Sequence, residues 1–138
     1  MPQKIIKEKE KKEKYFEAVG RRKTAVARVR LFTRPGGLIV NNKDYRQYFP
    51  IFHLQETAFS PLAKTQTKLE ATVKVVGGGL SSQAEAVRHG LTKCLILFDA
   101  KLKPILKSFG YLKRDPRMVE RKKYGLKKAR RAPQWVKR

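Results

Sequence analysis

The chain has 138 residues, 41% of them hydrophobic, which is enough for one folded domain with appendages. Its 34 lysines and arginines against 11 acidic residues give a formal net charge of +23. So much like charge repels itself unless an anionic partner binds, so nucleic acid and an anionic membrane surface are the favoured partners. A basic chain that is merely soluble is the third possibility.

The distribution of apolar residues favours nucleic acid over a membrane. No run of about 18 apolar residues is present, as a membrane-spanning helix requires. The first residues have neither the apolar stretch nor the cleavage site of a secretory signal. The single cysteine, Cys94, excludes an intramolecular disulfide and a cysteine-rich zinc site. We therefore expect a cytoplasmic protein that has no membrane association, metal, cofactor or small-molecule substrate.

The positive charge is concentrated towards the C-terminus. Residues 101–138 contain 15 basic and two acidic residues, and residues 15–100 contain 13 and six. Residues 1–14 contain six lysines and three glutamates, with little apolar surface to bury. We expect a charged, disordered extension at 1–14, a globular body at 15–112 and an extended RNA-binding tail at 113–138.

The first regular pattern of the body runs from Thr24 to Phe32. Apolar residues occupy the odd-numbered positions from 25 to 31, with Arg28 and Arg30 among the residues between them. This alternation predicts a half-buried strand. The sequence Pro-Gly-Gly at 35–37 then predicts a hairpin turn into a second strand.

The middle of the body is less regular. Pro50 and Pro61 are expected to restrict the helices of residues 45–63 to short pieces. A second alternating run, at residues 69–75, predicts another half-buried strand.

The best helix of the chain follows. Ser82 and Glu85 have the spacing of a capping box, which predicts that the helix begins there. Apolar residues at positions 84, 87, 91, 95 and 98 form one stripe suited to packing on a sheet. A further short helix is expected at residues 104–109, ending at Gly110.

A glycine loop at residues 77–79 joins the strand predicted at residues 69–75 to this helix. Backbone N–H groups converge at such a place, so Gly78 and Gly79 are candidate contacts to an RNA phosphate. The loop also resembles the phosphate loop of the galactokinase, homoserine kinase and mevalonate kinase superfamily. A nucleotide-binding phosphotransferase is therefore an alternative. Those kinases have a far longer chain, and no carboxylates for Mg²⁺ gather beside this loop, so we expect no enzymatic activity.

The histidines and the cysteine offer little catalytic chemistry. Neither His53 nor His89 has a partner at metal-ligand spacing, and we expect no catalytic role for either. His89 is expected on the surface of the helix, facing solvent or RNA. Cys94 lies beside the apolar stripe and is expected to be a buried structural thiol.

Three consecutive cations, Arg21, Arg22 and Lys23, precede the first strand. Because residues i and i+2 of a strand point the same way, Arg28 and Arg30 would form a two-pronged phosphate clamp on its polar face. No counter-charge lies near them in the sequence. We therefore expect all five cations to contact RNA.

Beyond Leu112 the apolar periodicity ends and cations occur in pairs and triplets. The tail cations expected to bind RNA phosphates are Lys113, Arg114, Arg117, Arg121, Lys122, Lys123, Lys127, Lys128, Arg130 and Arg131. Tyr111, Tyr124 and Trp135 lie among them, and rings beside cations suit an RNA with unstacked bases. We expect this tail to order on its partner and to span at most ~90 Å. A solubilising or localisation tail is the alternative.

Several of these segments together resemble the bacterial-type small-subunit ribosomal protein nine family. They are GRRKTAVARV at 20–29, GGG at 77–79 with QA at 83–84 and RHG at 88–90, DPRMVERKKYG at 115–125, and ARRAPQ at 129–134. The resemblance covers residues 15–138.

This resemblance implies an α/β (α+β) body with a small mixed sheet packed by helices, in the ribosomal protein S5 domain 2-like superfold. It implies a structural role in the small (30S) ribosomal subunit, with binding to the head (3′ major) domain of 16S rRNA beside neighbouring head proteins. It further implies that the tail reaches the peptidyl site, where Lys137 and Arg138 contact the tRNA anticodon stem-loop. A nucleic-acid-binding regulator that acts off the ribosome is the other alternative.

Overall fold

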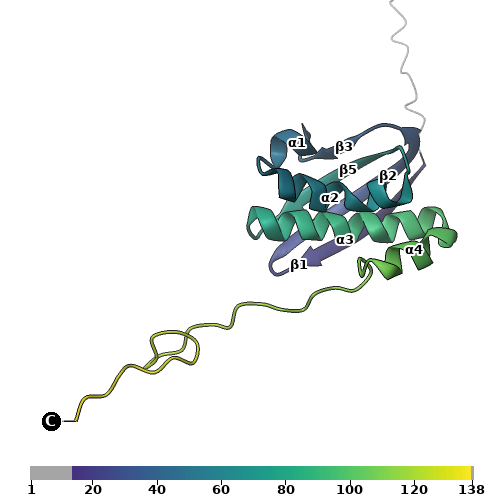
Figure 1. The fold of residues 1–138 in the computed structure, drawn as a ribbon. Coiled ribbons are helices and arrows are strands. Elements are labelled where there is room, and N and C mark those ends of the chain that lie inside the picture. Colours follow the sequence, from purple (N-terminus) through teal and green to yellow (C-terminus); the bar gives the residue numbers. More distant parts are fainter. Residues whose placement is uncertain (1–13, 138) are drawn as a thin grey trace, which may run out of the picture.

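One mixed β-sheet, covered by helices on one face, forms the folded body (Figure 1). The computed structural model describes residues 14–137, and within them five strands stand in the order β1-β2-β5-β3-β4. They are β1 (Tyr15–Arg22), β2 (Ala25–Pro35), β3 (Leu38–Val40), β4 (Lys43–Asp44) and β5 (Leu69–Val76). β3 runs parallel to β5, whereas the other neighbouring pairs are antiparallel. The expected small mixed sheet is therefore confirmed.

The helices lie together on one side of this sheet. They are α1 (Tyr45–Tyr48), α2 (Phe52–Thr65), α3 (Leu80–Phe98), the 3-10 helix η1 (Ala100–Leu102) and α4 (Lys103–Ser108). α2 and α3 lie side by side across the sheet, and α4 follows at the C-terminal end of α3 (Figure 1). The opposite face of the sheet carries no helix in the described part of the chain.

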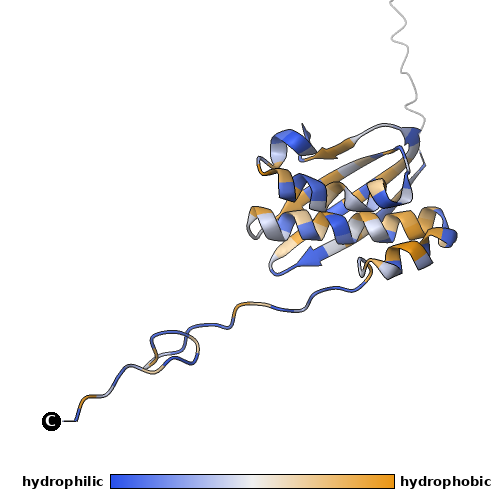
Figure 2. Cartoon of the chain, viewed as in Figure 1, coloured by the Kyte–Doolittle hydropathy of each residue, from blue (hydrophilic) through white to orange (hydrophobic). Residues whose placement is uncertain are grey.

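The core forms where the alternating strands meet the apolar stripe of α3. The odd-numbered residues of β2 from Ala25 to Leu31 are fully buried, as are Val87, Leu91 and Leu95 of α3. Because burying a Val or Leu side chain contributes about 1.5–3 kcal/mol, this contact is the main source of stability. Figure 2 shows the apolar residues gathered in the body, while the C-terminal segment is mostly hydrophilic. The two strands predicted from alternation, at residues 24–32 and 69–75, and the predicted apolar stripe of the helix are confirmed, although Phe98 stays 39% exposed.

The predicted hairpin between β2 and β3 is wrong. β5 lies between these two strands. The Gly36 amide donates to the Lys68 carbonyl at 3.2 Å, and the Ala71 amide donates to the Gly37 carbonyl at 3.1 Å. The glycine link therefore directs the chain around β5 instead of folding β3 back onto β2.

Pro61 does not end α2, contrary to expectation. The helix has 14 residues and contains Pro61, which is buried. Proline has no N–H to donate to the carbonyl four residues earlier, which here belongs to Thr57. The Ser60 hydroxyl donates to that carbonyl at 2.8 Å and so satisfies it.

The predicted capping box at the start of α3 is also wrong. α3 begins at Leu80 with Gly79 as its N-cap residue, and no side chain caps it. Ser82 is buried within the first turn, and Glu85 is drawn to an arginine of β1 instead. The side-chain amide of Gln83 donates from Nε2 to the Gly77 carbonyl at 3.0 Å, which ties the loop to the helix.

Two glycines allow α3 to lie directly against β1. A Cβ atom at Gly20 would be 1.9 Å from the Ala86 carbonyl oxygen and 2.3 Å from the Gly90 nitrogen. Both neighbours are backbone atoms, so no side-chain rotation could make room for that Cβ atom. Gly20 therefore sets the distance between strand and helix.

We predict that Gly20→Ala destabilises the body because the added methyl forces β1 and α3 apart. The free energy of unfolding in urea should fall by at least about 1–3 kcal/mol, the usual effect of overpacking. Gly37→Ala is the matched control, since a Cβ atom there meets nothing within 4 Å. Equal urea midpoints for the two variants would contradict this role of Gly20.

Candidate nucleic-acid interface

The turn between β1 and β2 presents part of the predicted cation cluster. Arg21 and Lys23 are exposed at this turn, and Lys23 adopts a left-handed conformation with φ of 51°. The structure thus leaves both side chains accessible to an anionic partner. Their contact with RNA stays a prediction.

Arg28 and Arg30 point the same way, as predicted, but an acidic residue lies beside them. Both side chains lie on the open face of the sheet, where the strand register sets Glu17 opposite Arg30. Glu17 accepts hydrogen bonds from the Nε atoms of both arginines. These bonds, chiefly that of Arg28, lower the pKa of Glu17. The expectation that the pair lacks a counter-charge is therefore wrong, because one carboxylate is shared between two guanidinium groups.

Aromatic rings support the same part of the sheet. The guanidinium of Arg30 lies over the Tyr15 ring at 5.1 Å, and that of Arg34 lies over the Phe32 ring at 5.1 Å. The Tyr15 and Phe32 rings are themselves 5.8 Å apart. The open sheet face therefore combines positive charge with flat apolar surface, which suits RNA phosphates and bases.

Arg22 does not lie on this surface. It is 9% exposed, and its Nε atom is 2.6 Å from the Glu85 carboxylate of α3. Its Nη1 atom donates to the Arg117 carbonyl at 3.0 Å, and its Nη2 atom is 3.3 Å from the Asp115 carboxylate. Arg22 was expected to contact RNA, but its buried guanidinium instead joins β1 and α3 to the start of the C-terminal tail.

This joint belongs to a short segment, residues 111–117, that we call the tail root. The Tyr111 ring is covered by the Arg88 guanidinium at 5.1 Å. The Arg117 side chain binds Asp115 with both Nε and Nη2, which together with the Arg117 amide lowers the pKa of Asp115. The tail root is therefore held against the body by a ring contact and by charge.

His89 is buried beneath this region rather than exposed, contrary to expectation. Its Nδ1 atom accepts a hydrogen bond from the Arg21 amide at 3.4 Å. Burial lowers the pKa of His89 first, followed by the nearby charges of Lys93, Arg114 and Arg88, while a backbone contact with Leu112 opposes them. The neutral imidazole is thus one of the groups on which the tail root rests.

The glycine loop has the geometry expected of a tight turn. Gly77 and Gly78 have φ values of 79° and 65°, a conformation that side chains rarely adopt. A Cβ atom at Gly78 would lie 3.0 Å from the Ala25 Cβ, whereas one at Gly79 would meet nothing within 4 Å. Gly78 and Gly79 are exposed, so their predicted contact with RNA is sterically open and remains a prediction.

Residues 118–137 form a second surface that is rich in positive charge. Within the part of the chain that the structure describes, this segment has no helix or strand, and it runs away from the body (Figure 1). Glu120 pairs with Lys123 and Arg130, and the Lys127 amide donates to the Arg131 carbonyl at 2.8 Å. These contacts close a small loop in the tail that the sequence did not predict.

Several tail cations make no ion pair or side-chain hydrogen bond with any described residue. They are Lys113, Arg114, Lys122, Lys127, Lys128, Arg131 and Lys137. The aromatic residues among them are also uncovered, with Tyr124 100% and Trp135 89% exposed. Arg138 and residues 1–13 lie outside the described residues, so the expectations for the N-terminal extension and the last cation are not addressed.

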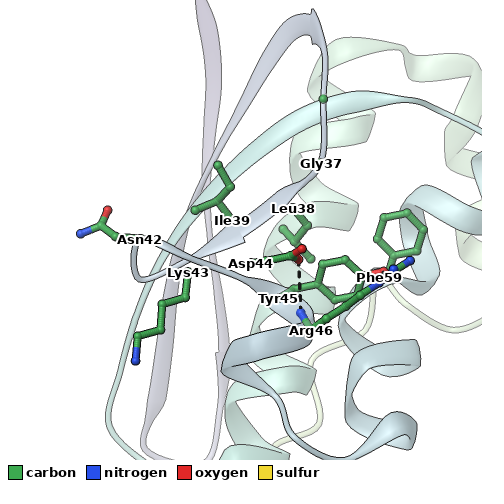
Figure 3. A pocket seen from close by; sticks show the side chains of 10 residues that line it. Gly37, Leu38, Ile39, Asn42, Lys43, Asp44, Tyr45, Arg46 and Phe59 are labelled. Carbon is green, nitrogen blue, oxygen red and sulfur yellow. Dashed lines mark hydrogen bonds between the residues drawn. The ribbon is translucent and has the colours of Figure 1, made fainter.

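A hollow of the body lies at the β3–β4 hairpin. It has a volume of about 510 Å³ and is lined by Tyr45, Arg46 and Phe59 among others (Figure 3). The Tyr45 and Phe59 rings stack at 5.2 Å, and Asp44 accepts a hydrogen bond from the Arg46 amide. None of its lining residues comes from the glycine loop at residues 77–79 or from the start of α3. The hollow and the glycine loop therefore do not form one nucleotide site.

Residues 14–137 have neither a metal-binding cluster nor a membrane-spanning helix. These residues contain no group of three or more His, Cys, Asp or Glu side chains placed to hold a metal ion. None of their helices is both long and apolar enough to cross a membrane. Cys94 is buried as expected, and burial raises the pKa of its thiol to about 12.

Sequence reasoning missed three residues that shape this interface. Glu17 was overlooked because β1 was not predicted, and only the register of β1 with β2 brings it to Arg30. Glu85 was assigned to a helix cap although it serves Arg22. Arg88 was given no role beyond its place in the RHG motif at residues 88–90. Its contact with Tyr111 depends on how the chain turns after α4.

We predict that Arg22→Ala releases the tail root from the body, because Asp115 and the Arg117 carbonyl lose their shared partner. Amide exchange at Arg117, whose N–H donates to Asp115, should accelerate on the order of tenfold, as for one charge-assisted hydrogen bond. Arg21→Ala removes the same charge from an exposed neighbour and should leave that rate unchanged. Equal protection of Arg117 in both variants would contradict the joint.

Comparison with known protein families agrees with this arrangement of a cationic sheet face and a cationic tail. A family model described as Ribosomal protein S9/S16 matches residues 20–138. The match includes β2, the glycine loop, α3 and the whole tail. Because it covers most of the sequence, the chain belongs to the ribosomal protein S9/S16 family, whose members are RNA-binding ribonucleoprotein components of translation.

Proposed function

We propose that this chain is a structural constituent of the small (30S) ribosomal subunit and binds the head (3′ major) domain of 16S rRNA, next to other head proteins. The observation that carries the proposal is the charge of the tail together with the family match over residues 20–138. Residues 101–138 contain 15 basic and two acidic residues, and most of the tail cations have no partner within the described chain. Binding to a polyanion relieves the mutual repulsion of these cations.

In this proposal the body, residues 15–112, docks through its exposed cations and the tail, residues 113–138, follows the RNA. Arg21, Lys23, Arg28 and Arg30 contact phosphates near β1 and β2, and the open backbone at Gly78 and Gly79 contacts another. Lys113, Arg114, Arg117 and the further tail cations neutralise phosphates along the path of the tail. Arg22 supports this interface from inside the body rather than by touching RNA.

The far end of the tail has a separate part in the proposal. It reaches the peptidyl site, where Lys137 and Arg138 contact the anticodon stem-loop of the bound tRNA. Lys137 is exposed at the end of a segment without regular structure, which supports this assignment. The five-stranded mixed sheet with helices on one face likewise supports the ribosomal protein S5 domain 2-like superfold.

We predict that the endogenous protein sediments with small subunits when a cytoplasmic lysate is separated at physiological salt. Added salt should release it from isolated subunits, since each phosphate contact adds roughly one unit to the slope of log affinity against log salt. A protein found mainly free of subunits, at the top of the gradient, would instead favour the regulator that acts off the ribosome.

We predict that removing Lys137 and Arg138 weakens tRNA binding at the peptidyl site on the order of tenfold or more, because two charge-assisted contacts are lost. Assembly of the subunit should remain intact, since the rest of the tail is unchanged. The double variant Lys127→Ala/Lys128→Ala removes the same charge within the tail and serves as control. The tip has no role of its own if truncated and intact subunits bind this tRNA equally.

A further inference from the structure

A crevice lies between α3 and the tail root, and we call it the root crevice. It has a volume of about 460 Å³ and is lined by Arg88, Gly110 and residues 113–117. We propose that the root crevice binds one phosphate group of the RNA backbone, with Arg88, Lys113 and Arg114 supplying the positive charge. The proposal rests on the proposed function, and it adds a residue of α3 and a defined place to it.

The charges that line the root crevice favour an anion. Four of its lining residues are cations and one is a carboxylate. The carboxylate is that of Asp115, which already forms ion pairs with Arg117 at 2.7 Å and with Arg22 at 3.3 Å. It therefore does not neutralise the three remaining cations, and the crevice has an excess of positive charge.

The donors of these three cations are available. Lys113 and Arg114 are exposed and form no ion pair or side-chain hydrogen bond with any residue between 14 and 137. The Arg88 guanidinium lies over the Tyr111 ring at 5.1 Å, and its N–H groups donate to no residue between 14 and 137. A guanidinium edge fits two phosphate oxygens, and an ammonium group adds a point charge beside them.

The root crevice exists before any ligand arrives. Its tail side is fixed by Arg22, whose side chain bonds to both Asp115 and the Arg117 carbonyl. The chain on either side of its lining residue Gly110 is ordered by stacking of Tyr111 on Phe109, with ring centroids 5.6 Å apart. A phosphate that enters therefore orders little additional chain, in contrast to one bound by the tail beyond residue 117.

The environment of His89 is a separate sign of positive potential at this place. Arg88, Arg114 and Lys93 all act on this one imidazole, although they come from α3 and from the tail root. Arg88 of α3 and Arg114 of the tail root also line the root crevice, so cations from two distant parts of the sequence meet there, whereas the Lys93 ammonium donates to the Val19 carbonyl at 3.1 Å. A shared phosphate would relieve their mutual repulsion.

The RNA backbone is the source of phosphate that the position of the crevice favours. The root crevice stands at the point where the cationic tail leaves the body, so an RNA strand that follows the tail passes its opening. An isolated phosphate ion would have only this one contact, whereas a strand is also held by neighbouring tail cations. The site therefore selects a phosphate within a chain of phosphates.

A double-mutant cycle tests whether one phosphate joins the two parts of the crevice. We would measure binding of the protein to the 3′ major domain of 16S rRNA for Arg88→Ala, Arg114→Ala and the double variant. Each single variant should weaken binding roughly tenfold, and the double variant should lose clearly less than the product of the two losses, because both residues hold the same group. Strictly multiplicative losses, or wild-type affinity for Arg88→Ala, would overturn the proposal.

Two controls separate charge and structure. Arg46 also covers a tyrosine ring, that of Tyr45 at 5.6 Å, but lies outside the crevice, so Arg46→Ala should bind RNA like the wild type. The pair Arg88→Ala and Arg131→Ala should show independent losses, since Arg131 lies in the distant tail. Because Arg88→Ala could loosen the tail root, Arg88→Lys keeps the charge and should restore most of the affinity. If it binds no better than Arg88→Ala, charge at position 88 is not the cause.

A second measurement follows the crevice directly and identifies the source of the phosphate. The ring signals of His89 in a nuclear magnetic resonance spectrum should shift when the rRNA fragment binds, and this shift should be absent in Arg114→Ala. Inorganic phosphate at the same concentration should leave them unchanged. Saturation by inorganic phosphate at lower concentration than by RNA would overturn the assignment to RNA. If the wild-type protein does not bind the rRNA fragment at all, the proposed function itself fails.

Discussion

A buried guanidinium sets the most demanding condition in this structure. Arg22 is 9% exposed, and an uncompensated charge at such a position costs about 3–5 kcal/mol. The chain satisfies it with a carboxylate from α3 and with a carboxylate and a carbonyl from the tail root. Three segments that are distant in the sequence are therefore positioned by the donors of one side chain. The close approach of β1 and α3 at Gly20 brings two of them together.

The same principle of charge matching divides the molecule in two. Most acidic residues of the body have assigned partners, as Glu17, Glu70 and Glu85 each bind arginine. Asp44 and Asp99 accept bonds from backbone amides at the starts of helical segments. The acidic residues of the body thus offset part of its charge, while the tail has only Asp115 and Glu120 to oppose its many cations. The requirement for an anionic partner falls mainly on the tail.

How far the sequence predicted this structure depends on the range of the interaction. Alternation in β2 and β5 and the stripe of α3 were readable because a core face repeats along each element. The Pro-Gly-Gly sequence led to a wrong hairpin prediction because the strand order depends on β5, which lies more than thirty residues further along the chain.

Side-chain partners that are distant in the sequence were also missed. Glu85 has the spacing of a local helix cap, but its carboxylate accepts a hydrogen bond from a buried arginine 63 positions earlier. Pro61 was tolerated because a neighbouring serine hydroxyl replaces the missing donor. The burial of His89 and of Arg22 was not expected, because burial of polar groups depends on tertiary partners, which a local pattern does not contain.

The loop in the tail, closed where the Arg130 Nε atom lies 3.0 Å from the Glu120 carboxylate, makes the length of the tail adjustable. An exposed ion pair contributes only about 0–1 kcal/mol, so binding of Arg130 to a phosphate would be enough to open it. The 11 residues from Glu120 to Arg130 hold roughly 35 Å of contour length. The closed loop is therefore a reserve of chain length. When it opens, the tip of the tail can move outward by a few nanometres while the tail root and the body keep their positions.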